Sequence, residues 1–215
     1  MAKKLRKNEG SDKLIPENEW IDPRILQLDE ERLLRHPLMQ RAFEKVMELH
    51  RKKHDIAFIS MCTSTRPYSR GVKWRTFKEK YGDMMDLIIC SSSGVMVPLE
   101  FDDCYPFMTY NVDQKKRNEE LYLKIINKRM NEFLDRFNYK YVIFNFRPTL
   151  NVVKVAQSVK RHSNHPENIY IYPSHETYEL AKSHKFKPYS IYYSDLSNDV
   201  MGELNGIIRD IQSKG

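Results

Sequence analysis

The sequence predicts a three-layer α/β fold, with a mainly parallel sheet and helices on both of its faces. Two observations lead to this prediction. Short apolar runs typical of buried strands alternate along the chain with longer segments whose apolar residues recur at helical spacing. Strands that are separated by helices are joined by right-handed crossovers, which make neighbouring strands parallel. With 215 residues, the chain is long enough to bury one sizeable core.

Five apolar runs have the length and composition of strands. DIAFIS at 55–60 is apolar almost throughout, which is typical of a strand buried on both faces. The others are MDLIICSS at 85–92, YKYVIFNF at 139–146, NIYIYP at 168–173 and YSIYY at 189–193. Since helical segments lie between them, these strands are expected to form one sheet.

Helical periodicity fills the segments between the strands. Helices are predicted from Pro37 to about 47, over 74–82, over 115–137, around 152–159, over 175–184 and over 200–211. Pro37 suits a first helical turn, where its missing N–H costs nothing. Trp74, Phe77 and Tyr81 share one face of the second helix, so we interpret Trp74 as a packing residue rather than a ligand-binding one.

Composition and cysteine usage indicate a cytoplasmic protein. Hydrophobic residues make up 40% of the chain and charged residues 30%, as in ordinary globular domains. No apolar run approaches the roughly 20 residues that span a bilayer, and the first residues lack the apolar core of a secretory signal, so no membrane contact is expected. Three scattered cysteines, Cys62, Cys90 and Cys104, argue against a disulfide framework and for a reducing compartment.

The charge balance favours a polyanionic partner. The formal net charge is +7, and Lys or Arg side chains that neutralise phosphates release bound counterions. The 13 tyrosines and 10 phenylalanines add faces on which bases can stack. Residues 1–15 are lysine-rich and poor in apolar side chains, which predicts a disordered basic arm, with 16–215 forming a single α/β domain.

In a parallel sheet, ligands bind outside the carboxyl ends of the strands. That rule selects the loops at 62–71, 91–106, 145–150 and 172–179. In the first loop, Arg66 and Tyr68 are held by the intervening Pro67, and we favour a binding role for them. Arginine can hold phosphate oxygens bidentately, and tyrosine can stack on an exposed base.

The candidate residues fall into two groups. The ligand- or nucleic-acid-binding candidates are Arg66, Pro67, Tyr68, Ser92, Ser93, Gly94, Arg147 and His175. The catalytic candidates are Cys62, Arg66 and His175, because a Cys62–His175 pair across neighbouring loops would supply a nucleophile and a base. Inert packing is the alternative interpretation of the cysteine. Ser91–Gly94 either forms an anion-binding nest of backbone amides or is a plain exit from the strand.

Neither a metal nor a cofactor is expected. The three cysteines are too far apart for a zinc site of the CxxC type. His50 and His54 lie in HRKKH, without the glutamate of the HExxH motif, and are interpreted as a solvated helix end. Neither the GxxxxGK[ST] nor the GxGxxG phosphate-binding pattern occurs.

The segments ISMCTSTRPYS, SSSGVMVP and YPFMTYNV resemble the conserved domain that follows the catalytic domain in archaeal archaeosine synthase. The resemblance covers roughly residues 50–195 in strand and loop order. It implies a fold similar to uracil-DNA glycosylase and a role in tRNA modification. It also implies that the barrel and the RNA-binding module of the longer relatives are supplied by a separate transglycosylase-like or RNA-binding chain.

The family motif is Pro-Cys-x3-Lys-Pro-Tyr-x2-Ser-x2-His. Cys62, Pro67 and Tyr68 match it, whereas Met61, Arg66, Gly71 and Trp74 replace its proline, lysine, serine and histidine. Arg66 keeps the charge but loses the titratable amine of lysine, which favours binding over catalysis. In comparison with uracil-DNA glycosylases, no carboxylate precedes Pro67, so hydrolysis of a glycosidic bond by that route is not expected.

Three functions follow, in order of preference. The first is a module that binds tRNA or another nucleic acid, or a modified base, in archaeosine-type tRNA modification. The second is an independent glycosylase- or transferase-like enzyme acting on nucleic acid or a nucleoside. The third is a subunit that binds another protein and no ligand.

Overall fold

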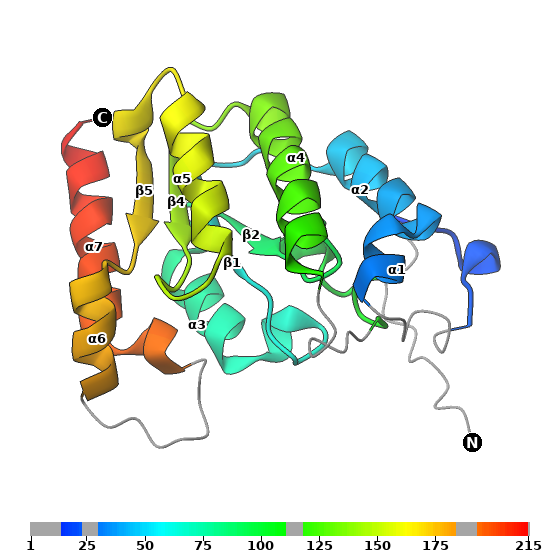
Figure 1. The fold of residues 1–215 in the computed structure, drawn as a ribbon, viewed down its shortest axis with the longest axis horizontal. Helices are drawn as coiled ribbons and strands as arrows, with labels where there is room; N and C mark the ends of the chain where they lie inside the picture. Colours follow the sequence, from blue (N-terminus) through cyan, green and yellow to red (C-terminus); the bar gives the residue numbers. More distant parts are fainter. Residues whose placement is uncertain (1–13, 23–29, 111–117, 184–192, 215) are drawn as a thin grey trace.

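The computed structural model describes residues 14–22, 30–110, 118–183 and 193–214. They form a five-stranded sheet of order β3-β2-β1-β4-β5 (Figure 1). The strands are β1 (Ile56–Met61), β2 (Asp86–Cys90), β3 (Met96–Pro98), β4 (Tyr141–Asn145) and β5 (Ile169–Tyr172). All neighbouring pairs are parallel except β2–β3, which is antiparallel. The predicted mainly parallel sheet is confirmed.

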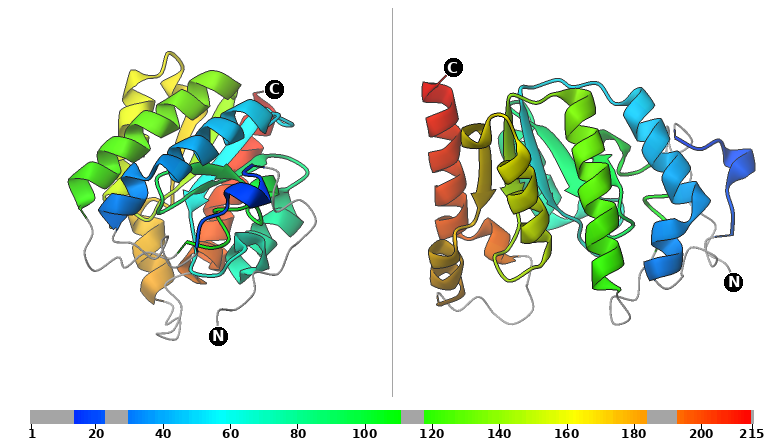
Figure 2. Two further views of the ribbon diagram at one scale, coloured as in Figure 1. Left: turned by 90° about the vertical axis from the view of Figure 1, so that its right-hand side faces the viewer. Right: turned by 45° about the horizontal axis from the view of Figure 1, so that its top comes forward.

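Helices cover both faces of the sheet. They are α1 (Glu30–Arg35), α2 (Pro37–Leu49), α3 (Val72–Tyr81), α4 (Glu119–Phe137), α5 (Val152–His162), α6 (His175–Ser183) and α7 (Asn198–Ser213). Short 3-10 helices include η3 (Tyr68–Arg70), η4 (Leu99–Phe101) and η7 (Tyr193–Leu196). Figure 2 shows α2, α4 and α5 on one side of the strands and α3 and α7 on the other. The predicted three layers are therefore present.

The first predicted helix begins and ends for identifiable reasons. Pro37 occupies its first turn, and the ring Nδ1 of His36 accepts a hydrogen bond from the Leu38 amide at 3.2 Å. Its apolar face is buried. The helix ends at Leu49, where His50 turns into extended backbone.

Helix α3 packs against the sheet through the aromatic face that the sequence predicts. Trp74 and Phe77 are fully buried, and Tyr81 nearly so. The Phe77 ring lies 4.7 Å from that of Phe58 in β1, measured between centroids. The predicted packing of Trp74 against the sheet is confirmed, although its indole Nε1 has no hydrogen-bond partner.

The structure differs from the predictions at several points. Strand β3 lies in a segment predicted as a loop, because three residues ending in Pro98 carry little strand signal. Of the strand expected at 189–193, residues 189–192 lie outside the described residues, and Tyr193 begins η7 instead. Residues 1–13 of the predicted arm, 115–117 of one helix and 184 of another also lie outside the described residues. Leu14 and Ile15 are buried, so they belong to the core rather than to an arm.

Candidate functional site

The carboxyl ends of β1, β2, β4 and β5 lie at one edge of the sheet, because the four strands are parallel. We call this the carboxyl edge; it is the lower edge of the sheet in Figure 1. The loops that follow the strands, the first turn of α3 and η7 meet there. This is the edge at which the sequence places the candidate site.

Buried polar atoms without partners are concentrated at the carboxyl edge. In the part of the chain that the structure describes, six buried side-chain nitrogen or oxygen atoms lack a hydrogen-bond partner: Thr63 Oγ1, Arg66 Nε, Trp74 Nε1, Asn145 Nδ2, Asn145 Oδ1 and Tyr172 OH. Every one belongs to a strand end, a following loop or the first turn of α3. Buried polar atoms are normally bonded, so a cluster of exceptions indicates a place where a bound molecule or water supplies the partners.

Asn145 and Tyr172 form a polar row on the inner side of this edge. They end β4 and β5 and are register partners, so their side chains lie on the same face of the sheet. Ser60 of β1 is the register partner of Asn145 on its other side. Two residues before Ser60, Phe58 contacts the rings of Trp74 and Tyr172, with centroids 6.5 and 6.2 Å apart. The row therefore lies on the face that α3 covers.

A buried ion cluster borders this row. Asp195 of η7 accepts from Lys73 Nζ at 2.8 Å and from Arg147 Nε at 3.2 Å. Lys73 Nζ also donates to the carbonyl of Met61 at 3.3 Å. Arg147 was predicted to bind a ligand or nucleic acid, but its side chain is mostly buried and ties the loop after β4 to η7. A structural role is the more direct interpretation of this arginine.

Arg66 and Tyr68 lie together, but their side chains contact each other rather than an open binding surface. The Arg66 guanidinium lies over the rings of Tyr68 and Tyr110, 4.2 and 4.8 Å from their centroids, and donates to the carbonyls of Thr63 and Thr65. Tyr68 is fully buried, and its hydroxyl lies 2.5 Å from that of Tyr110. Burial raises the pKa of Tyr68 well above its ordinary value. The expected stacking of Tyr68 on a base is therefore wrong for this arrangement, since its ring faces Arg66.

The Ser91–Gly94 loop is a closed turn. Ser91 Oγ accepts from the Ser93 amide at 3.0 Å, and the Gly94 amide donates to the Ser91 carbonyl at 2.9 Å. Gly94 has φ 78°, and a Cβ there would meet a side-chain carbon of Leu34 at 2.9 Å. Because these amides already have partners, the plain strand exit describes the loop better than an anion-binding nest does.

Cys62 and His175 are not placed as a catalytic pair. They follow β1 and β5, and β4 lies between those strands, so the expectation of neighbouring loops is wrong. Cys62 Sγ donates to Ser92 Oγ at 3.7 Å, whereas His175 is exposed at the start of α6. In the described ranges no histidine is hydrogen-bonded to the thiol.

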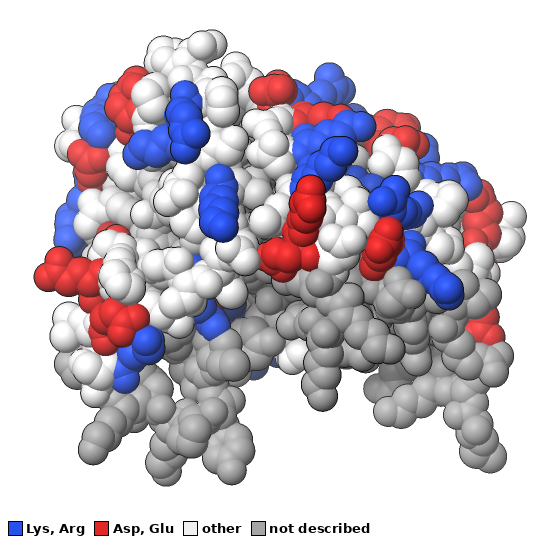
Figure 3. Space-filling model, viewed as in Figure 1, with Lys and Arg blue, Asp and Glu red and all other residues white. Residues whose placement is uncertain are grey.

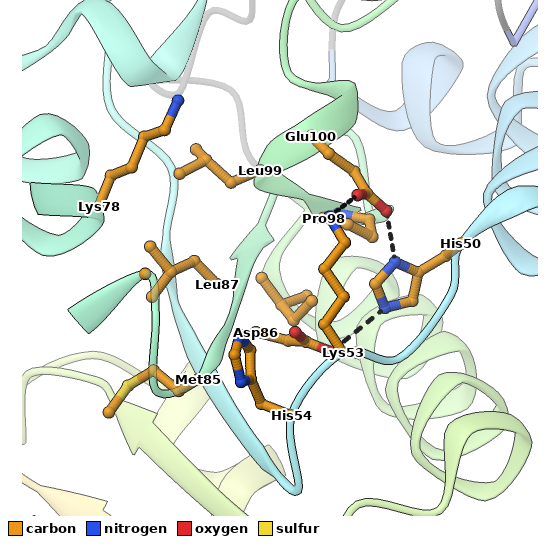
Figure 4. Close-up of a pocket in the computed structure, with 12 residues that line it drawn as sticks. His50, Lys53, His54, Lys78, Met85, Asp86, Leu87, Pro98, Leu99 and Glu100 are labelled. Carbon is orange, nitrogen blue, oxygen red and sulfur yellow. Dashed lines mark hydrogen bonds and ion pairs between the residues drawn. The ribbon is translucent and has the colours of Figure 1, made fainter.

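The opposite edge of the sheet, which we call the amino edge, carries a pocket of about 250 Å³ (Figure 4). It is lined by His50, Lys53, His54, Lys78, Gly82, Met85, Asp86, Leu87, Ile88, Pro98, Leu99 and Glu100. His50 is buried, which contradicts the prediction of a solvated helix end. Nor do His50 and His54 share a helix, because α2 ends at Leu49. No local pattern around His50 indicates the distant residues that bury it.

The buried His50, Tyr139 and Asp86 beside this pocket are bonded to one another, and His50 also bonds the exposed Glu100. His50 Nδ1 lies 2.9 Å from Glu100 Oε1, and His50 Nε2 lies 2.9 Å from Tyr139 OH. Tyr139 donates to Asp86 at 2.9 Å. The hydrogen bond from His50, supported by Lys53, lowers the pKa of Glu100 to about 2, and burial raises the pKa of Tyr139. A network with its partners in place is a structural device, so we do not place the site here.

The described residues offer neither a metal-binding cluster nor a membrane-spanning helix. Over the described ranges, no three His, Cys, Asp or Glu side chains are grouped so that they could hold a metal ion. No helix in the same ranges is long and apolar enough to cross a membrane. On the face formed by α2, α4 and α5, lysine and arginine are interspersed with acidic side chains, so no continuous basic surface forms there (Figure 3).

Comparisons with known proteins give a family without an assigned function. A crystal structure described as that of AF0587, a protein of unknown function, is similar with a TM-score of 0.47 and 17% identity. The similarity covers 67% of this chain and 50% of that one, so this chain spans about half the length of the solved protein. No curated protein matches. The family described as "Domain of unknown function (DUF5591)" matches residues 39–183, and the chain belongs to it.

Proposed function

We propose that this protein is a base- and RNA-binding module of tRNA modification, of the type associated with archaeosine synthase. The observation that carries the proposal is the cluster of buried, unpartnered polar atoms at the carboxyl edge. Such atoms cost about 1–3 kcal/mol each when they have no partner, so a bound molecule that pairs with them would recover that free energy. The resemblance of the Cys62–Tyr68 loop to the archaeosine-synthase motif supports a modified base as that molecule.

Exposed arginines next to the edge supply a surface for phosphate. Arg70 ends η3, and Arg75 lies in the second turn of α3. Both residues are exposed. Lys73, between them in sequence, is buried in the ion pair with Asp195 and does not add to this surface. A base held at the edge would therefore have its backbone close to two free cations.

The arrangement supports binding better than catalysis. Arg66 is fixed by two carbonyls and two aromatic rings, and an arginine does not lose its proton. Cys62 has a serine as its neighbour rather than a base. The catalytic step would then belong to a separate chain, such as the transglycosylase-like partner that the resemblance implies.

The test is tRNA binding by the full chain as a function of salt concentration. The double variant Arg70→Glu/Arg75→Glu should lower affinity for tRNA at least about tenfold and reduce the slope of log affinity against log salt by about 1–2. Lys140→Glu/Arg161→Glu is the matched control, because it makes the same charge change with exposed residues at the amino edge. Equal losses in the two variants, or no tRNA binding at low salt, would refute the proposal.

A further inference from the structure

We propose that the pocket at the amino edge binds a small carboxylate with an apolar body, that is, a short acyl chain or a single aromatic ring. The pocket, of about 250 Å³, is lined by residues from the end of α3, the start of β2 and the end of β3 (Figure 4). This inference does not rest on the proposed function, because the base- and RNA-binding site lies at the opposite edge of the sheet. It concerns a second site with its own ligand.

The pocket exists because β3 ends before it reaches the start of β2. The last register pair of the two strands is Ile88 with Pro98, and the chain then turns into η4 at Leu99. Asp86 and Leu87 of β2 therefore have no strand beside them on the side away from β1. Proline has no N–H with which to continue a ladder, so the strand ends here for a local reason.

The wall of the pocket is largely apolar. It includes the buried side chains of Met85, Leu87, Ile88 and Pro98, together with the half-buried Leu99. Apolar ligand surface that is removed from water against such a wall favours binding. Pockets for drug-sized molecules measure roughly 300–1,000 Å³, so this smaller volume suits one ring or a short chain.

The charged or titratable side chains that remain free at the pocket are basic. Among the described residues that line it, His54 and Lys78 have neither a side-chain hydrogen bond nor an ion pair. Lys78 lies in the last turn of α3, and His54 lies just before β1, so the two come from separate elements. A carboxylate at the mouth of the pocket would give the Lys78 ammonium the partner that it lacks.

The acidic side chains of the pocket are already paired. Glu100 accepts from Lys53 Nζ at 2.6 Å and lies 2.9 Å from His50 Nδ1. Asp86 accepts from the Lys53 amide at 3.0 Å and from the Tyr139 hydroxyl at 2.9 Å. A cationic ligand would have to replace these partners, which disfavours it. The two carboxylates also repel a doubly charged phosphate more than a singly charged carboxylate.

The experiment titrates the full chain with small probes and follows its backbone amide signals by NMR. The probes are 3-phenylpropionate and hexanoate, and the corresponding amides are uncharged controls of the same shape. The acids should shift the amide signals of Gly82 and Leu87, which line the pocket, and should bind at least about tenfold more tightly than the amides. Equal binding of acids and amides, or no shift at these two residues, would overturn the inference.

A chain-length series tests the apolar wall separately. Affinity should rise about threefold for each methylene that the wall covers between acetate and hexanoate. Acetate that binds as tightly as hexanoate would show that only the charge is recognised and would contradict the proposal.

One variant with a matched control assigns the binding to Lys78. Lys78→Gln removes the free charge from an exposed side chain and should weaken binding of 3-phenylpropionate at least about fivefold. Lys80→Gln makes the same change in the same helical turn, but Lys80 does not line the pocket, so affinity should stay the same. Both residues are exposed, so both variants should fold. Equal losses in the two variants would contradict the assignment.

A free carboxylic acid and the C-terminal end of a peptide share this chemistry. The dipeptide acetyl-Ala-Phe, with a free or an amidated C-terminus, distinguishes the two sources. Tighter binding of the free-carboxylate dipeptide than of 3-phenylpropionate would identify a peptide end as the ligand, and weaker binding would identify a free acid. An amidated dipeptide that binds as tightly as the one with a carboxylate would contradict the proposal.

Discussion

Buried polar groups have hydrogen-bond partners at one edge of the sheet and lack them at the other. At the amino edge, the buried His50, Tyr139 and Asp86 bond to one another, and the network ends on the exposed Glu100. At the carboxyl edge, buried polar atoms of Asn145 and four other residues have no partner. The pocket of about 250 Å³ lies at the amino edge, yet the buried polar groups beside it already have their partners.

The difference teaches where to look for the ligand of the proposed function. A bonded network adds stability and fixes the elements that it joins, whereas an unpaired buried group costs free energy until something binds to it. The pocket described above would select the amino edge. Hydrogen-bond satisfaction selects the carboxyl edge, which agrees with the general position of ligands on parallel sheets.

The largest expected loss of stability concerns the buried ion cluster at the carboxyl edge, whose charged groups are paired. Asp195→Ala leaves the cations of Lys73 and Arg147 without their shared carboxylate, so the free energy of unfolding should fall by about 3–5 kcal/mol. Urea denaturation measures this. Asp55→Ala, which removes an exposed ion pair with Lys52, is the control and should change stability by less than about 1 kcal/mol. A loss no larger than the control would show that the cluster does not hold η7.

A matched pair of smaller changes compares the edges directly. Tyr139→Phe removes a hydroxyl that bonds His50 and Asp86, and should cost about 1–3 kcal/mol of unfolding free energy. Tyr172→Phe removes a hydroxyl without a partner, so it should cost nothing or stabilise the chain. Both are measured by urea denaturation without ligand. Equal losses would break the distinction between the two edges.

The smallest effect concerns acid stability at the amino edge. Hydrogen bonding from His50 lowers the pKa of Glu100 from an ordinary 4.5 to about 2 in the folded chain. The carboxylate therefore contributes stability that is fully present above pH 4.5 and is lost as the pH falls towards 2. The difference in unfolding free energy between the natural chain and Glu100→Gln should shrink over this interval. A difference that stays constant from about pH 6 to about pH 3 would contradict the assigned network.

Local pattern was sufficient to predict most of the fold. The spacing of Trp74, Phe77 and Tyr81 reports the buried face of α3, and the apolar runs report β1, β2, β4 and β5. Strand β3 was not predicted, because its three residues end in proline and form a strand only through pairing with β2. Buried parallel strands carry a strong local signal, whereas a short antiparallel edge does not.

The rule on strand ends selects the same edge at which we propose the site, but not its residues. Asn145 begins the candidate loop at 145–150 without being named as a site residue, and Asp195 fell in no candidate loop. The buried ion pair of Lys73 could not be predicted, because its partner Asp195 is 122 residues away in sequence (195 − 73). One available signal was the polar Asn145 directly after the apolar run VIF. Its missing partners could only be seen once the register placed it beside Tyr172.

The most direct test uses the two indole N–H signals in the NMR spectrum of the chain. Trp20 Nε1 donates to the Ile15 carbonyl at 2.8 Å, whereas Trp74 Nε1 has no partner, so Trp20 is an internal control. If the carboxyl edge is a binding site, adding the free base 7-deazaguanine should shift the Trp74 indole proton downfield and leave that of Trp20 in place. A Trp74 signal that stays fixed at saturating base, or shifts no more than that of Trp20, would contradict the assignment of the site to this edge.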